Sequence, residues 1–467
     1  MDAFQAAVYI GVDNRRAYLK KRSPSRDADS FQHALRGFFR SDDVLRLLRH
    51  NDGRWKLHSE VEWFAFMPLD AGGNIGVCAA CFGGNIDDKV SRLKRRLLMT
   101  ASVWRHIESF HIPYLVAFKR LGWEVHVGCA EAPAQAPSVD VCIELPFEKQ
   151  MTAPTNFRAA RILRQSIQSG HYDLIITHTS LASFFTRLAV KGMKMRPPLC
   201  NVMHGYLFDD DTPALKRRVL LSAERLTARQ TDLLLVMNDW DFRLAERYRL
   251  GKRVERIPGM GVDFSRLESA TRADGMSLRT ELGIAEDAFV LLYAAEFSPR
   301  KSQPVLIRAM KALPGNAVLA LCGKGATWEE CLSLARTLGV EGRVLFPGQV
   351  SDMPAWYRMA DACVSASRSE GLPFNVMEAM YAGLPVVASQ VKGHVDLIED
   401  GADGLLYEYG NTDACAKQVA RLMADASLRQ ALSAAARVRA ASYRLETVLP
   451  VVMDRYLSAM DGGRCCE

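Results

Sequence analysis

Long apolar runs are missing from this sequence, and several other familiar signals are missing with them. No stretch of about 18 apolar residues occurs, so we expect no membrane-spanning helix. The first residues lack a compact apolar segment followed by a cleavage site, so we expect a cytoplasmic protein. The net charge of +7 is modest for 467 residues, and no basic block is interleaved with aromatic residues. We therefore predict no nucleic-acid partner.

The cysteine and glycine patterns disfavour two further classes. The 11 cysteines of an unsecreted chain are expected to be free thiols rather than a disulfide framework. Cys78 and Cys81 form a lone C-x-x-C with no second pair at zinc spacing, which disfavours a metal or redox role for them. Neither half of the chain shows G-x-G-x-x-G after its first strand, and residues 322–325 hold only a lone G-x-G. This pattern argues against a nicotinamide dehydrogenase.

What is present is ample apolar material for two or three globular cores. The hydrophobic content is 49%, and a single core stops growing at about 250–300 residues. Residues 1–92 are poorly patterned and receive no fold. A small extra module, a weakly ordered extension and an upstream mis-start of the reading frame all stay open for them.

From residue 93 onward, short apolar strands alternate with helices, which predicts an α/β fold of doubly wound parallel sheets. We assign residues 93–262 and 263–445 to two Rossmann-like domains that face each other across a cleft. Residues 446–467 form a last helix and tail, and the return of that helix to the first domain stays open. The expected strands are 95–102, 123–130, 172–179, 198–205, 231–238, 288–297, 317–325, 343–350, 362–367 and 384–389. The expected helices are 111–122, 156–170, 180–192, 213–230, 303–313, 327–339, 353–360, 375–383 and 412–425.

Two glutamates follow the strand at 362–367, and they differ in local setting. Glu370 lies in a Gly-Pro loop, and Glu378 lies in the following helix, for which Asn375 is the expected N-cap and Gly383 the stop. Loop amides and the positive helix end form an anion site at the strand's carboxyl edge, and a diphosphate is the obvious anion. Glu378, expected in the first turn, would repel phosphate and instead suits sugar hydroxyls. The alternative is a capping carboxylate and a solvated loop charge.

Arg300 and Lys301 follow the strand at 288–297 and lie in the loop that leads into the next helix. Adjacent cations at this place could neutralise a departing diphosphate. The alternative is a pair of solvated basic residues.

At this point the motifs carry a family likeness over roughly residues 93–460. The spacing of Glu370 and Glu378 in "EGLPFNVMEAM", followed by "AGLPVVAS" and "GADGLLY", resembles the E-x7-E signature of the retaining glycosyltransferases of family 4. "FSPRKS", "CGKG", "VLFPGQV" and "YRMADACVSAS" precede it in the expected order. In the first domain "YDLIITHTS", "VMHGYLF" and "PGMGVD" are similar to the capsule and exopolysaccharide branch. The resemblance implies the GT-B architecture, with donor and acceptor meeting between two Rossmann-like domains.

By motif match, the resemblance implies that Glu378 holds the ribose hydroxyls of a nucleotide sugar. Glu370 would hold the transferred sugar together with the backbone of three loop residues, which are Gly371, Leu372 and Pro373.

The resemblance also implies how the diphosphate is held. Phe374 and Asn375 would offer backbone amides to it, while Arg300 and Lys301 would neutralise it. His204 would lie near the sugar from the opposite domain. Glu370, His204 and Lys301 are thus the expected catalytic residues, and no metal is required.

Two departures from the family pattern qualify these assignments. The glycine pair that often follows the first strand is absent, so no phosphate role is assigned there. Residues 295–297 read Ala-Glu-Phe where many members have Gly-Arg-Leu. This leaves Arg300 and Lys301 as the main cationic pair.

The reaction implied by the resemblance moves a hexose-type sugar from a nucleoside diphosphate, with a UDP-sugar as the first choice, to an acceptor hydroxyl with retention. No glycosidase-like carboxylate pair is identifiable, so a double displacement is not favoured. The expected acceptor is a lipid-linked oligosaccharide for cell-surface polysaccharide. A peripheral contact with the cytoplasmic face of the inner membrane is expected through the basic helix at 213–230, with a solvated helix face as the alternative. A nucleotide-sugar epimerase or hydrolase, or a non-catalytic nucleotide-sugar-binding protein, stays open.

Overall fold

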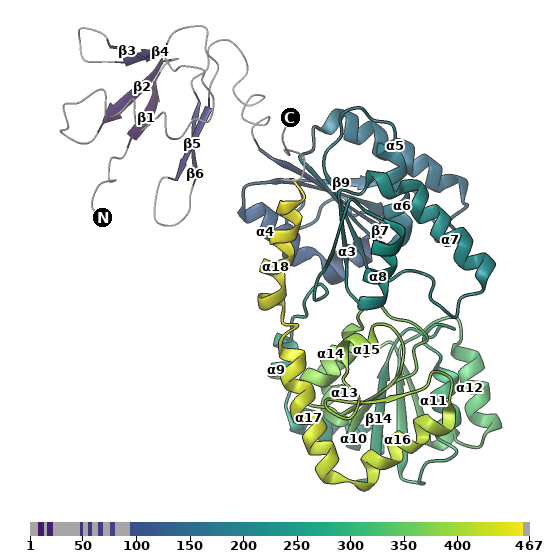
Figure 1. Cartoon of the computed structure of the whole chain (residues 1–467). Coiled ribbons are helices and arrows are strands. Elements are labelled where there is room, and N and C mark those ends of the chain that lie inside the picture. The colour runs from purple at the N-terminus through teal and green to yellow at the C-terminus, as the bar shows by residue number, and fades with distance from the viewer. Residues whose placement is uncertain are drawn as a thin grey trace. The chain divides into compact units, whose positions relative to one another are not determined.

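The computed structural model describes residues 94–460 and, before them, the backbone of six short strands (Figure 1). The chain divides into two compact units, Met1–Lys94 and Arg95–Glu467. In the first unit the strands pair antiparallel, β1 (Val8–Asp13) with β2 (Arg16–Lys21), β3 (Leu47–Arg49) with β4 (Trp55–Leu57), and β5 (Phe64–Pro68) with β6 (Ile75–Ala79). The prediction about the thiols of Cys78 and Cys81 lies outside the side chains that are described.

The second unit begins with a seven-stranded parallel sheet in the order β13-β12-β11-β10-β7-β8-β9. Its strands are β7 (Arg96–Val103), β8 (Glu124–Ala130), β9 (Val141–Glu144), β10 (Leu174–His178), β11 (Leu199–Met203), β12 (Leu233–Val236) and β13 (Arg253–Arg256). Its helices are α3 (Trp104–Phe110), α4 (Ile112–Arg120), α5 (Pro154–Gly170), α6 (Ser180–Val190), α7 (Ala214–Thr227) and α8 (Asp239–Tyr248).

Burial on both faces explains why these strands read as continuous apolar runs. In β7, Leu97 and Met99 pack on one face of the sheet, whereas Leu98 packs on the other against α5 and α6. Successive strand residues point to opposite faces, so a strand covered on both sides has no polar alternation. This is the sheet type that the sequence predicted.

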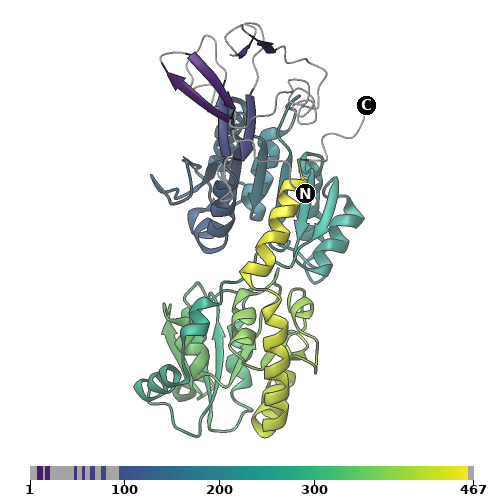
Figure 2. The ribbon, with the colours of Figure 1, turned by 90° about the vertical axis from the view of Figure 1, so that its left-hand side faces the viewer.

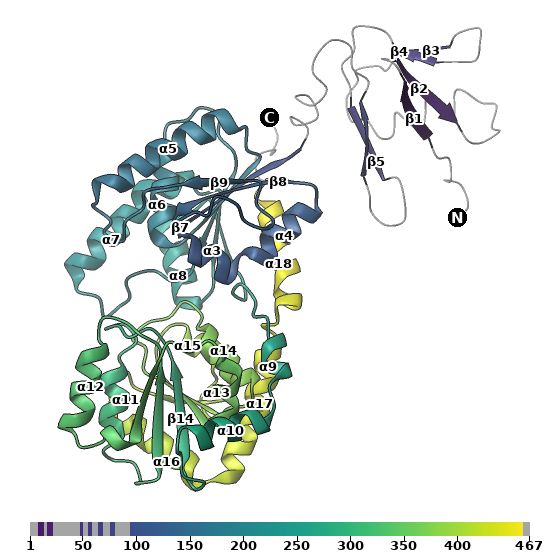
Figure 3. The ribbon, with the colours of Figure 1, turned by 180° about the vertical axis from the view of Figure 1, so that it is seen from behind.

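A six-stranded parallel sheet follows, in the order β16-β15-β14-β17-β18-β19. Its strands are β14 (Phe289–Ala294), β15 (Ala317–Cys322), β16 (Val344–Gly348), β17 (Ala362–Ser365), β18 (Val386–Ser389) and β19 (Leu405–Tyr407). Its helices are α9 (Ser265–Ser269), α10 (Arg272–Glu281), α11 (Gln303–Ala309), α12 (Trp328–Thr337), α13 (Met353–Met359), α14 (Phe374–Tyr381), α15 (His394–Leu397), α16 (Thr412–Ala424) and α17 (Ala426–Ala441). Figures 1 and 3 place α11 and α12 on one side of this sheet and α10 and α13 on the other.

The last helix, α18 (Leu445–Ser458), leaves the second domain and lies against α4 of the first (Figure 2). The Tyr456 ring stacks on Phe118 and meets Tyr114 edge-on. The chain therefore passes between the domains twice, and the two crossings are bonded to each other. The amide of Val262 donates to the carbonyl of Tyr443, and the amide of Leu445 donates to the carbonyl of Val262, both at 2.9 Å.

Four elements of the first domain were not predicted, namely α3, β9, α8 and β13. No element was assigned between residues 238 and 263, where α8 and β13 lie. Helix α3 begins directly after β7 without a capping side chain or a breaker, so the sequence has no boundary there. Strand β9 is a four-residue edge strand, too short for a clear period. Over the part of the chain that is described, no helix combines the length and the apolar character needed to cross a bilayer.

Candidate active site

Two loops at the carboxyl ends of neighbouring strands form the predicted donor site. Arg300 and Lys301 follow β14, and Glu370 follows β17, which pairs with β14. Parallel neighbours end at the same edge of a sheet, so the loops lie side by side. The Lys301 ammonium lies 2.5 Å from one Glu370 oxygen, and the Arg300 guanidinium lies 2.9 Å from the other. The sequence predicted these groups separately, and the fold brings them together.

Glu370 is a buried carboxylate that stays ionised. Its side chain is 8% exposed. Burial acts to raise its pKa, but the charges of Lys301 and then Arg300 outweigh burial and lower the pKa to about 2. Each carboxylate oxygen has two lone pairs, so the group can still accept a hydrogen bond from a ligand hydroxyl.

Helix α14 begins beside this carboxylate, and it begins differently from the prediction. Pro373 occupies the N-cap position, and no side chain caps the helix. Asn375 was predicted as the N-cap, which is wrong, because it lies inside the first turn, where its carbonyl accepts from the Tyr357 hydroxyl at 3.3 Å. The first-turn amides of Phe374 and its successors have no capping acceptor and carry the positive end of the helix dipole.

Glu378 lies in the second turn of α14, not in the first turn as predicted, because the helix already begins at Phe374. It is half-buried and accepts a hydrogen bond from Tyr357 at 2.8 Å. Burial raises its pKa, and the Tyr357 hydrogen bond offsets this in part. Glu370 and Glu378 thus have opposite pKa shifts for the same side-chain chemistry.

The loop after Glu370 touches the first domain so closely that only glycine fits. A Cβ at Gly371 would lie 1.9 Å from the carbonyl oxygen of His204. Gly205 has a positive φ of 119°, and its Cβ would meet Gly371 at 3.1 Å. Leu372, which is buried, lies against Gly259 of the chain crossing. His204 and Gly371, which the sequence placed in opposite domains, are therefore in backbone contact.

A buried ion pair next to this contact was missed from the sequence. The Lys392 ammonium, in the loop after β18, lies 3.0 Å from Asp241 of α8 in the first domain. It also donates to the carbonyls of Tyr206 and Phe208. A lysine in "SQVKGH" and an aspartate in "NDWD" have no sequence link, so only the fold could pair them.

The loops after β14, β15 and β16 and helix α3 enclose a cavity of about 630 Å³. Its lining includes His106, Phe110, Glu296 and Lys324. The lone G-x-G of residues 322–325 has a packing reason here, since a Cβ on either glycine would overlap a carbonyl of the β14 loop. A larger cavity of about 820 Å³ lies at the opposite, amino-terminal edge of the sheet, beside Ala288 and Phe289, away from the predicted site residues.

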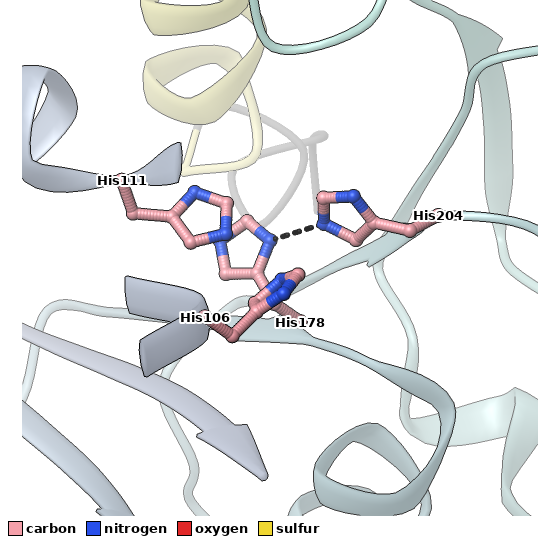
Figure 4. Close-up of side chains that lie close together, drawn as sticks. All are labelled: His106, His111, His178 and His204. Atoms are coloured by element: carbon pink, nitrogen blue, oxygen red, sulfur yellow. Dashed lines mark hydrogen bonds between the residues drawn. The ribbon is translucent and has the colours of Figure 1, made fainter. Parts of the chain in front are cut away.

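Four histidines gather in the first domain (Figure 4), and one of them, His106, lines the cavity of about 630 Å³. His106 comes from α3, His111 from the turn after it, His178 from the end of β10 and His204 from the turn after β11. Strands β7, β10 and β11 are adjacent, so the four side chains meet at one sheet edge. One ring nitrogen of each lies within 4.8 Å of the others. His178 Nδ1 and His204 Nε2 share a hydrogen bond of 3.1 Å.

These imidazoles are uncharged at neutral pH. Burial lowers the pKa of His106 to about 4 and lowers those of the other three well below the usual value, with the neighbouring histidines adding to the shift. Both nitrogens of His111, and Nε2 of His106 and of His178, are buried and bond to no other described residue. An unpaired buried polar group costs about 1–3 kcal/mol. The sequence analysis singled out only His204 of this group.

The comparisons with known proteins agree with this geometry. A model described as "Glycosyl transferase 4-like domain" matches residues 114–259, and one described as "Glycosyl transferases group 1" matches residues 276–439. The "Putative glycosyltransferase EpsD" of Bacillus subtilis is 30% identical over 374 residues, which cover 79% of this chain and 98% of EpsD. The chain belongs to the GT-B glycosyltransferases.

Further relatives of this glycosyltransferase fit the same family. The D-inositol 3-phosphate glycosyltransferase of Saccharomonospora viridis is 30% identical over 317 residues, 64% of this chain and 72% of the relative. The crystal structure of HepE from Anabaena in complex with UDP and glucose superposes with a TM-score of 0.65. It is 22% identical and covers 78% of this chain and 100% of that chain, so it shares the fold.

One missed histidine, His178, did leave a signal in the sequence of this glycosyltransferase. His178, like the predicted His204, is the next-to-last residue of a predicted strand, at 172–179 and 198–205. Consecutive parallel strands of a doubly wound sheet often lie next to each other, so two strand-end histidines predict a shared edge. His106 and His111 had no such signal, because α3 itself was not predicted.

Proposed function

We propose that this glycosyltransferase moves a hexose-type sugar from a nucleoside-diphosphate sugar, first of all a UDP-sugar, to an acceptor hydroxyl with retention of configuration. The buried Glu370, held by Lys301 and Arg300 beside the uncapped start of α14, is the observation that carries the proposal. The cavity of about 630 Å³ is in the size range of ligand sites, although its lining does not include Glu370, Lys301 or Arg300. That HepE was solved with UDP and glucose supports UDP-sugars as the first donors to test.

In the proposed reaction, each group has a separate task. The amides at the start of α14, with Lys301 and Arg300, stabilise the leaving diphosphate. Glu370 accepts hydrogen bonds from the transferred sugar, and Glu378 accepts them from the ribose. The acceptor oxygen attacks from the face that the diphosphate leaves, and the diphosphate takes the acceptor proton. Positioning and charge stabilisation then supply the catalysis.

The donor and the stereochemistry are tested together. Differential scanning fluorimetry across UDP-, GDP- and ADP-sugars identifies the donor, because a ligand that binds the folded state raises its melting temperature. NMR of the early product then reports the anomeric configuration. Inversion would overturn the retaining assignment. Sugar release at the same rate with and without acceptor would favour the hydrolase alternative, and a changed nucleotide sugar would favour the epimerase.

We propose further that the acceptor is a lipid-linked oligosaccharide, reached by peripheral contact with the cytoplasmic face of the inner membrane. Helix α7 supports this with an exposed apolar stripe of Leu215, Val219 and Leu226, which are 78%, 61% and 54% exposed. These positions lie on one helical face. Three basic residues flank the stripe, Arg218, Arg225 and Arg229. An apolar stripe beside cations is the pattern of a helix that lies in an anionic membrane surface.

Vesicle co-sedimentation tests the membrane contact. Binding should rise with the anionic lipid fraction and fall in the double variant Leu215→Ser/Val219→Ser. The matched control is Val438→Ser on α17, which removes a residue that is 77% exposed in the second domain. Binding that ignores anionic lipid, or that both variants lose equally, would contradict membrane docking through α7.

A further inference from the structure

The four-histidine cluster of His106, His111, His178 and His204 has the chemistry of a metal site. Neutral imidazole nitrogen is the preferred protein ligand of Zn²⁺ and suits Ni²⁺, Co²⁺ and Cu²⁺ as well. We propose that the cluster binds one divalent transition-metal ion of this class, with Zn²⁺ as the first candidate. This proposal does not depend on the identity of the donor or acceptor.

The spacing of the ring nitrogens fits such an ion. Tetrahedral Zn²⁺ with Zn–N bonds of about 2.0–2.1 Å places its ligand nitrogens about 3.3 Å apart. His178 Nδ1 and His204 Nε2 are already 3.1 Å apart, and the whole set lies within 4.8 Å. His111 and His178 stack with ring centroids 3.7 Å apart, so at least one of these two rings must turn before all four nitrogens face one ion. Figure 4 shows the four rings gathered at one place.

The hydrogen bonds of the cluster point to the same conclusion. Four of its ring nitrogens are buried without a partner among the described residues, and two more bond only to each other. Buried polar groups in folded proteins are nearly always satisfied, so this set calls for a ligand. His111 is 0% exposed, and neither of its nitrogens finds a partner within residues 94–460. A bound metal ion would accept the lone pairs that nothing else accepts.

The cluster also has an entry path and a position that matters. His106 lines the cavity of about 630 Å³, so an ion can reach the cluster from solvent. The backbone carbonyl of His204 contacts Gly371 in the loop that follows Glu370. A metal ion bound to His204 would hold the His204–Gly205 turn to the first sheet, against the loop of Glu370. Its role is to position that turn, while Arg300 and Lys301 remain the groups for the diphosphate.

Metal content of the full-length, untagged protein tests the proposal. The protein is stripped with a chelator, dialysed, titrated with ZnCl₂ and analysed by inductively coupled plasma mass spectrometry. We expect about one tightly bound Zn²⁺ per chain, a rise in melting temperature on the order of 4 °C at 100 times the dissociation constant, and the visible spectrum of four-coordinate Co²⁺ after CoCl₂ addition.

Two ligand variants and one control make the result specific. His106→Gln, at the cavity wall, should lose the ion, whereas His171→Asn, an exposed histidine outside the cluster, should keep it. His111→Phe replaces an unsatisfied ring with an apolar one of similar size. It should fold in chelator at least as well as the wild type but lose the response to Zn²⁺. A wild-type protein that binds no Zn²⁺ or Co²⁺, or a His106→Gln protein that keeps the full equivalent, would overturn the proposal.

Discussion

The edges of the two sheets that approach each other use opposite electrostatics. At the first sheet, four uncharged histidines gather, and three of them have ring nitrogens without a partner in the described part of the chain. At the second sheet, a buried carboxylate is held by two cations and stays charged down to a pH of about 2. The difference teaches that burial alone does not decide charge. Glu370 keeps its charge because partners outweigh desolvation, whereas the histidines have only one another.

The largest expected effect is a fall in the turnover number when the Lys301–Glu370 ion pair of the second domain is removed. Lys301→Ala removes a cation from the proposed diphosphate site and should lower the turnover number by about 1,000-fold, the scale of losing a preorganised charge-stabilising group. The matched control is Lys311→Ala, which removes an exposed lysine of the same domain. Initial rates at saturating donor, normalised to folded protein, provide the measurement. Near-normal transfer by Lys301→Ala would rule out its catalytic assignment.

The second-largest expected effect comes from breaking the Lys392–Asp241 ion pair, which joins the two domains. Lys392→Met leaves Asp241 buried without its cation and should lower the free energy of unfolding by about 3 kcal/mol. Chemical denaturation measures it. The double variant Lys392→Met/Asp241→Leu should recover part of the loss, because it removes the stranded charge. A single variant as stable as the wild type would mean that the domains do not hold each other here.

Gly371→Ala separates the regions without changing any charge. Its Cβ would overlap the His204 carbonyl at 1.9 Å, so the Glu370 loop must move away. A displacement of about 1 Å at a catalytic group costs about 100-fold in rate. The control is Gly315→Ala, because a Cβ at Gly315 would have no atom within 4 Å and the residue has no positive φ. Equal rates for the two variants would contradict the requirement for this contact.

The smallest expected effect is a pH dependence that distinguishes the two regions. When the pKa of a histidine is lower in the folded state than its unfolded value of 6.5, the unfolded state binds a proton first as the pH falls. The free energy of unfolding therefore decreases as the pH falls below 6.5. For His106 the loss runs from pH 6.5 to about 4, at up to about 1.4 kcal/mol per pH unit. For Glu370, the corresponding loss of stability runs from pH 4.5 to about 2. In chelator, His106→Gln should reduce the slope in the upper range only, because the other three histidines still contribute to it, and an unchanged slope there would refute the assignment.

The sequence predicted much of the fold, because parallel strands buried on both faces have continuous apolar runs in the sequence. It also predicted Glu370, Lys301 and Arg300 as candidates, since each follows a strand whose carboxyl end faces the ligand side. It could not predict that they bond to one another, because β14 and β17 are separated by β15 and β16 in the chain and become neighbours only in the folded sheet. Lys392 with Asp241 and the set around His111 were missed for the same reason. The start of α14 was misplaced because Pro373, at the N-cap, has no capping side chain, so that Asn375 was the first residue of a capping type.

The return of the chain through α18 has a consequence for how the molecule is made. The Tyr456 ring that covers Tyr114 and Phe118 is synthesised long after them. The seven-stranded domain therefore leaves the ribosome before the six-stranded domain but is completed after it, and no single cut in the chain yields both domains whole. A fragment ending before Leu445 would present Tyr114 and Phe118 to solvent. Separate expression of the two domains thus requires α18 to be supplied to the first domain as a peptide.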